Sequence, residues 1–152
     1  MNKLLVLCFA SLLSCSTAIS QKSSKEQPIG EIIVSQSQGG TEKANFSIIK
    51  NQNELRDIIV KNFNNAGIEP IMDIPEFPKN KKLVVYHFGR FNSGDHQLKK
   101  IRSITVENNI LFIDIPAYDS GGMEIQMLSD PWSIIAVPSH LQFNSVQLKY
   151  SK

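Results

Sequence analysis

The sequence has little cysteine, no long hydrophobic run and almost no excess of either charge. Of its 152 residues only Cys8 and Cys15 are cysteines, and both precede the region expected to fold, so we expect neither a disulfide nor a thiolate metal site there. No run reaches the roughly 18 apolar residues of a membrane-spanning helix. The net charge is +2, and the scattered lysines have no aromatic stacking platform beside them, which argues against a nucleic-acid partner.

Motifs for catalysis and cofactor binding are missing as well. The sequence has no His-Glu-x-x-His spacing, no Gly-x-Ser-x-Gly elbow and no glycine-rich loop leading into a helix. His87, His96 and His140 are far apart in sequence, although distant positions can still converge on a metal. His87 lies in an apolar run, where a half-buried core residue is expected. We therefore predict no catalytic residue, no metal and no cofactor, and a chain that is not an enzyme.

Residues 1–20 have the pattern of a secretory signal peptide, with a short positive start and a largely apolar run over Leu4–Leu13. Two cleavage sites compete. The first ends at Cys15 and resembles a bacterial lipobox, which would make Cys15 the lipidated residue. The second follows Ser20 and suits an ordinary signal peptidase. We predict an exported protein: an outer- or inner-membrane lipoprotein held only by its lipid, or a periplasmic or secreted protein if cleavage follows Ser20.

Residues 21–29 are polar and are predicted to be a flexible tether to a single domain over 30–152. One helix is predicted in that domain, from Asn51 to Ala66. Asn51 can cap it, Glu54 has the spacing of a capping box, and the apolar residues fall on one face. This helix is expected to cover one face of a sheet.

About eight short strands are predicted. The central one is Leu83–Phe88, whose nearly continuous apolar run indicates burial on both faces. A bulge between Leu98 and Ile104 would correct an imperfect alternation, and Asn108-Asn109 is a compact turn candidate. The other predicted strands are 31–34, 45–49, 98–106, 110–115, 125–128, 133–137 and 146–150. The expected fold class is α+β, mostly β, as a sandwich or an open barrel with one covering helix.

Two loops are candidates for contact with a partner. The first is bracketed by Gly89 and Gly94, and the second carries the only tryptophan, Trp132, after a proline. That tryptophan is either a plug for one end of the sheet or a binding hot spot. The predicted partner-binding residues are Arg90, Phe91, Asn92, Ser93, Gly94, His96, Pro131 and Trp132.

The stretch 83–101 resembles the C-terminal domain of the protease-complex subunit family (PrcB-like). That family has an apolar strand, a glycine, a polar turn of the form Ser/Thr-Gly-Gly-aromatic, and an alternating strand. The turn here is Ser93-Gly94-Asp95-His96, and Asp130-Pro131-Trp132 matches a later proline-aromatic element. The resemblance covers roughly 32–138. It implies a non-catalytic accessory subunit, secreted or lipid-anchored, whose protein partner is a secreted protease.

A second similarity is to chagasin-like inhibitors of cysteine peptidases, which use three loops. Asn92-Ser93-Gly94, Ser120-Gly121-Gly122 and Asp130-Pro131-Trp132 follow the same order here. The first loop lacks the proline of the inhibitors, and the last has aspartate in place of arginine. A peptidase inhibitor and a structural envelope lipoprotein are therefore the alternatives to an accessory subunit.

Overall fold

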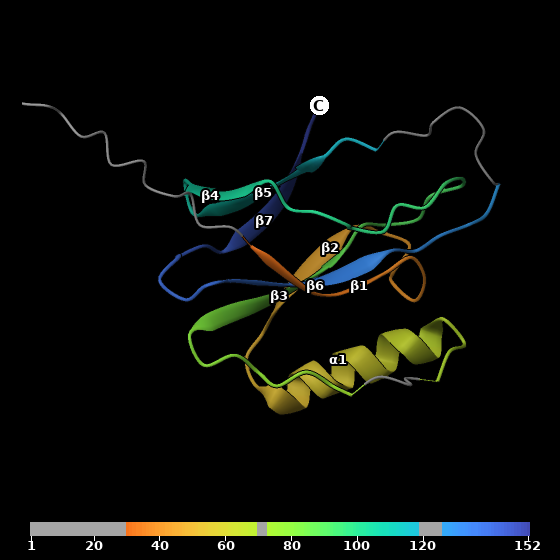
Figure 1. The fold of residues 1–152 in the computed structure, drawn as a ribbon, viewed down its shortest axis with the longest axis horizontal. Helices are drawn as coiled ribbons and strands as arrows, with labels where there is room; N and C mark the ends of the chain where they lie inside the picture. The colour runs from red at the N-terminus through yellow and green to blue at the C-terminus, as the bar shows by residue number, and fades with distance from the viewer. Residues whose placement is uncertain (1–29, 70–72, 119–125) are drawn as a thin grey trace, which may run out of the picture.

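The computed structural model describes residues 30–69, 73–118 and 126–152, where the chain forms a three-layer arrangement (Figure 1). The predicted leader with Cys15 and the tether 21–29 lie outside these residues. Within them the structure has seven strands and one helix, which confirms a mostly β, α+β sandwich with one covering helix. The elements are β1 (Glu31–Gln36), β2 (Asn45–Ile49), α1 (Gln52–Asn65), β3 (Lys81–His87), β4 (Ser103–Glu107), β5 (Ile110–Pro116), β6 (Trp132–Pro138) and β7 (Ser145–Ser151).

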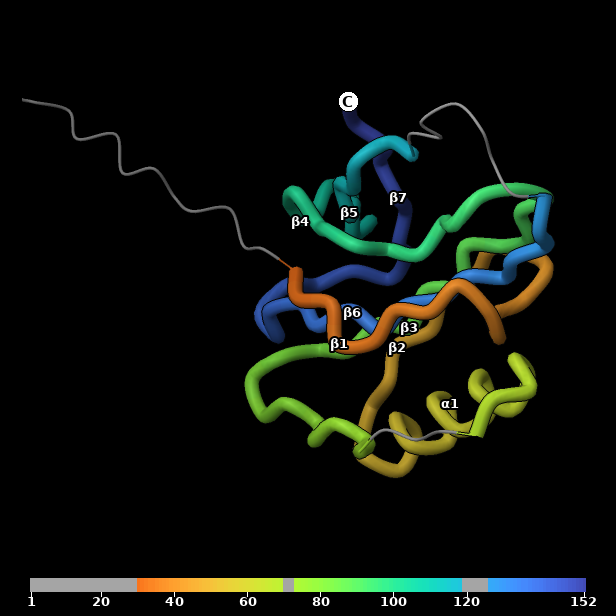
Figure 2. Tube along the Cα trace, turned by 45° about the vertical axis from the view of Figure 1, so that its right-hand side comes forward, coloured from red at the N-terminus to blue at the C-terminus, as the bar shows by residue number. Residues whose placement is uncertain are grey.

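The strands form two sheets. The larger sheet is antiparallel with the order β1-β6-β3-β2, and the smaller has the order β4-β5-β7, in which β5 and β7 run parallel. Figure 2 shows the larger sheet as the middle layer, with α1 on one face and the smaller sheet on the other. The two central strands of this middle layer, β6 and β3, therefore bury both of their faces.

The alternation of side chains along β3 and β6 explains their apolar sequences. In β3, Leu83 and Val85 pack in the cluster with α1, while Val84 between them packs in the cluster between the sheets. In β6, Ile134 faces α1 and Ile135 faces the smaller sheet. A stretch of strand with two buried faces has no solvent-facing position, so its sequence is largely apolar. The predicted burial of the central strand is confirmed.

The ends of α1 follow from local chemistry. The side chain of Asn51 accepts a hydrogen bond from the backbone N–H of Glu54 at 3.0 Å, as an N-cap residue does. At the other end Gly67 has a φ of +69°, and the N–H of Ile68 donates to the carbonyl of Phe63 at 3.1 Å. This is the Schellman arrangement that glycine favours. The predicted helix is confirmed at both ends.

The turn at Asn108-Asn109 is also confirmed. Both asparagines have positive φ, 51° and 62°, and they join β4 to β5. Two positive φ values in a two-residue loop match the twist of the flanking strands, and asparagine tolerates them better than most residues.

One predicted strand begins too early, and another is wrong. The strand over 98–106 begins only at Ser103, and no bulge is needed, because Leu98 and Ile101 reach the core between the sheets from a loop. Residues 126–128 of the predicted strand 125–128 are not in a strand, and residue 125 lies outside the described part of the chain. In both cases apolar residues close together in the sequence indicated a paired strand. Leu98 and Ile101 are instead buried without strand pairing, and residues 126–128 are exposed.

Candidate partner-binding site

Three connecting segments meet at one end of the larger sheet, and we call them the loop end. They are 37–44 after β1, 88–102 after β3, and 126–131 before β6. Figure 1 and Figure 2 show the first and third segments and the start of the second on the right-hand side, and the rest of the second segment then runs back toward β4. Phe91 and Ser129 exchange backbone hydrogen bonds of 2.8 and 2.9 Å, which join the second segment to the third.

Two adjacent glycines allow the first segment to approach its neighbours backbone to backbone. The N–H of Gly40 donates to the carbonyl of Asp130 at 2.7 Å, and a Cβ at Gly40 would lie 2.5 Å from that oxygen. Gly39 has a φ of +97°, and a Cβ there would lie 2.0 Å from the carbonyl oxygen of Asn62 in α1. Any side chain at either position would push the segments apart.

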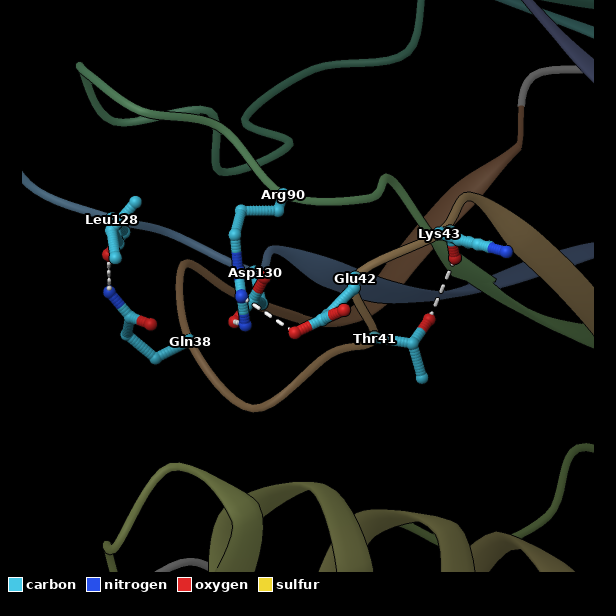
Figure 3. Close-up of polar contacts among 7 residues, drawn as sticks. All are labelled: Gln38, Thr41, Glu42, Lys43, Arg90, Leu128 and Asp130. Atoms are coloured by element: carbon cyan, nitrogen blue, oxygen red, sulfur yellow. Dashed lines mark hydrogen bonds and ion pairs between the residues drawn. The ribbon is translucent and has the colours of Figure 1, made fainter.

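Arg90 joins all three segments through its side chain (Figure 3). Its Nε and Nη2 donate to the two carboxylate oxygens of Asp130 at 2.9 and 3.0 Å, and its Nη1 donates to Glu42 at 2.7 Å. The hydrogen bond to Asp130, the largest cause, raises the pKa of Arg90, and the charges of both carboxylates add to the shift. The guanidinium is exposed but already paired, so it acts chiefly by setting the geometry of the loop end.

Three rings stack against one another, those of Phe91 and His96 from the second segment and that of Tyr118 from just after β5. The centroid of the His96 ring lies 3.7 Å from that of Phe91, with 14° between the two ring planes. It lies 4.1 Å from the centroid of the Tyr118 ring, with 32° between the planes. The Nε2 of His96 is 2.9 Å from the carbonyl oxygen of Ser93, so that nitrogen must carry the proton it donates. Gly94 has a φ of +78°, and a Cβ there would lie 2.1 Å from the hydroxyl oxygen of Tyr118. Phe91 and His96 of the predicted loop therefore build one aromatic wall together with Tyr118.

Apolar side chains are exposed beside this wall. Tyr118, Met127 and Leu128 are 42%, 50% and 58% exposed. The carbonyl of Leu128 accepts a hydrogen bond from the side chain of Gln38 at 2.8 Å (Figure 3), so the backbone at Leu128 is held in place. Asn92 is also exposed. Exposed apolar side chains on a fixed backbone are typical of contact surfaces.

Trp132 and Pro131 require a correction. The side chain of Trp132 is 0% exposed. Its ring packs edge-to-face on that of Phe63, with 6.0 Å between the ring centroids, and its indole N–H donates to the carbonyl of Gln38 at 2.9 Å. Pro131 is buried as well. The structure corrects the prediction that these residues contact a partner, because neither reaches the surface. Trp132 instead fills the end of the interface between the larger sheet and α1.

His87 lies in the same interface and is buried, in agreement with the expected half-core position. Within the described part of the chain its Nδ1 has no hydrogen-bond partner. Burial, with a smaller contribution from the charge of Lys61, lowers the pKa of His87. The described residues contain no group of three or more His, Cys, Asp or Glu side chains placed to hold a metal ion.

Comparison with protein-family models, with curated proteins and with solved structures finds no match to the chain. None of the helical residues described in the structure forms a segment long and apolar enough to cross a membrane. The middle loop of the chagasin-like pattern, 120–122, lies outside the described residues.

Sequence patterns missed four residues of the candidate site: Glu42, Met127 and Leu128 of the loop end, and Tyr118, which follows β5. Glu42 and Tyr118 carry no local signal, because their partners Arg90 and His96 are distant in sequence. Met127 and Leu128 had a signal, an apolar pair beside a turn, but that signal was assigned to a strand.

Proposed function

We propose that this protein is a non-catalytic binding module that captures a protein partner at its loop end. The observation that carries the proposal is the combination of exposed apolar side chains with cross-linked loops. Hydrogen bonds and ion pairs from Arg90, Gly40 and Phe91 join the three segments before any partner arrives. A preformed surface loses less conformational freedom on binding, so more of its contact energy appears as affinity.

The proposed contact surface consists of Phe91, Asn92, Tyr118, Met127 and Leu128. Arg90, Gly94 and His96 support it by positioning loops and rings. The resemblance to the PrcB-like family suggests that the partner is a secreted protease, with this chain as its accessory subunit at the cell envelope. The proposed surface differs from the sequence-based site because Met127 and Leu128 replace Pro131 and Trp132, and because Tyr118 is added. Ser93 of the predicted site supports the surface through its carbonyl, which accepts the hydrogen bond from His96.

Inhibition of a cysteine peptidase is the second candidate. One observation favours it: the first and last of the three inhibitor-like loops lie together at one end of the sheet. The burial of Trp132 weighs against it, because the tryptophan of the third loop cannot enter an active site. Titration of a papain-like enzyme with the purified chain separates the two candidates, since only an inhibitor abolishes peptide hydrolysis stoichiometrically.

The proposal is tested by crosslinking the affinity-tagged full chain in native envelopes. We expect wild type to yield a specific partner that a Met127→Ser, Leu128→Ser double variant loses. The matched control is Ile68→Ser, because Ile68 is an apolar residue of similar exposure (45%) that follows α1 outside the loop end. Identical capture by wild type and the double variant would contradict the proposal and would favour a structural envelope protein.

A further inference from the structure

A cavity of about 240 Å³ opens beside the loop end, between the ends of the two sheets. Phe88, directly after β3, contributes the larger sheet's side of the lining, and Ile115 of β5 and Tyr150 of β7 contribute that of the smaller sheet. Leu98 adds a buried apolar side chain from the loop. The cavity is therefore a continuation of the core between the sheets, reached from the surface.

Aromatic rings dominate its walls. The stacked rings of Phe91, His96 and Tyr118 form one side, and Phe88 and Tyr150 add two more rings. The volume exceeds the roughly 150 Å³ of an apolar cavity that accepts benzene. It is smaller than the roughly 300 Å³ at which pockets for complete small-molecule ligands begin. The size suits a single ring-bearing side chain.

The charged residues that line the cavity include more bases than acids. Lys99 and Lys100 line it together with one acid, Asp95, whose carboxylate lies 3.1 Å from the ammonium of Lys99. Both lysines are exposed, so their charges face the solvent from which a partner would approach. Two lysines against one aspartate leave a positive excess, which favours carboxylates on the segment that binds.

Building on the proposed function, we propose that this cavity takes one aromatic side chain from an acidic segment of the partner protein. The ring would enter between the wall of Phe91, His96 and Tyr118 and the side chain of Phe88. The carboxylates beside it in sequence would lie near Lys99 and Lys100. A single buried aromatic anchor with a charged rim is a common way for a small surface to gain most of its binding energy.

The probe is a fluorescein-labelled, acetylated peptide of sequence Asp-Glu-Trp-Glu-Asp, titrated with the full chain and followed by fluorescence anisotropy. We expect saturable binding that weakens by about tenfold or more when alanine replaces the peptide's tryptophan, as for an anchor residue. A peptide with lysine in place of its four acids should also bind more weakly, and added salt should reduce that difference.

The matching change in the protein is Ala117→Trp. Ala117 lines the cavity but is itself exposed, so a larger side chain can occupy the space without entering the core. This variant should lose binding of the tryptophan peptide by about tenfold or more. Lys100→Glu should weaken binding, whereas Lys79→Glu, at an exposed position before the other end of β3, should not.

Equal affinities for the tryptophan and alanine peptides would overturn the inference, as would an absence of saturable binding. A second measurement needs no variant: the peptide should shift the NMR ring resonances of Phe91, His96 and Tyr118 in the wild-type chain. Unshifted rings in the presence of bound peptide would place the peptide elsewhere and overturn the inference.

The envelope experiment separates this inference from the proposed function. If the Met127→Ser, Leu128→Ser variant loses the partner while Ala117→Trp retains it, the loop end binds and the cavity does not receive the anchor. If the double variant captures the same proteins as wild type, the proposed function itself fails.

Discussion

The two faces of the larger sheet are built from the same strands, yet at the loop end one face is closed by packing and the other is open. On the face toward α1, Trp132 fills the interface to its edge and is fully buried. On the face toward the smaller sheet, the same end of the sheet has the half-buried Phe88 and an open cavity. One face is closed by the chain's own largest side chain, and the other leaves room for a side chain from elsewhere.

This difference follows from the alternation of side chains along a strand, which sends neighbouring residues to opposite faces. Only one of the two interiors can receive the ring of Trp132. The other is closed less completely, by loop residues such as Leu98 and by a stack of rings. We infer that, at this end of the sheet, the helix face serves stability alone, whereas the proposed binding belongs to the face toward the smaller sheet.

The largest expected effect comes from breaking the closed face with Trp132→Ala. Removing a fully buried tryptophan should lower the free energy of unfolding by about 3–5 kcal/mol, measured by urea denaturation. Phe88→Ala, on the open face, should cost clearly less, because its ring is only partly buried beside existing empty space. Equal losses for the two variants would show that the two faces are packed to the same degree.

The aromatic wall of the open face is tested by Gly94→Ala. Gly67 offers a matched control. Gly67 and Gly94 both have positive φ, but a Cβ at Gly67 would have no neighbour within 4 Å. Gly67→Ala should therefore cost only the backbone term, about 1–2 kcal/mol. Gly94→Ala should cost more and should also displace Tyr118, which would change the ring-current shifts of His96. Equal costs with unchanged ring resonances would show that the stack does not depend on Gly94.

The smallest effect expected is a pH dependence from the closed face. Since burial lowers the pKa of His87 in the folded state, the unfolded chain binds a proton first, and stability should fall as the pH drops below the ordinary value of about 6.5. The slope from one such group is at most about 1.4 kcal/mol per pH unit. Urea denaturation at about pH 7.5 and about pH 5.5 measures the loss on either side of the ordinary histidine pKa.

His87→Gln should reduce this pH dependence, whereas His140→Gln, at an exposed position, should leave it unchanged. An unaltered slope in His87→Gln would mean that other groups cause the loss of stability in acid.

The sequence alone determined the features that depend on near neighbours. The cap at Asn51 and the glycine ending of α1 arise from hydrogen bonds within a few residues. The turn at Asn108-Asn109 depends on two consecutive φ values, and the burial of β3 on its continuous apolar run. Such signals are complete in a short window, so the fold class could be predicted from them.

Only the tertiary structure decided which side chains meet at the loop end. Arg90 pairs with Asp130, 40 residues later, and with Glu42, 48 residues earlier. The strand order β1-β6-β3-β2 brings their loops together, and no local pattern encodes that order. The same holds for Trp132, whose surroundings depend on where α1 packs. Apolar character predicts that a residue will be buried or will bind, but the packing of distant elements determines which of the two occurs.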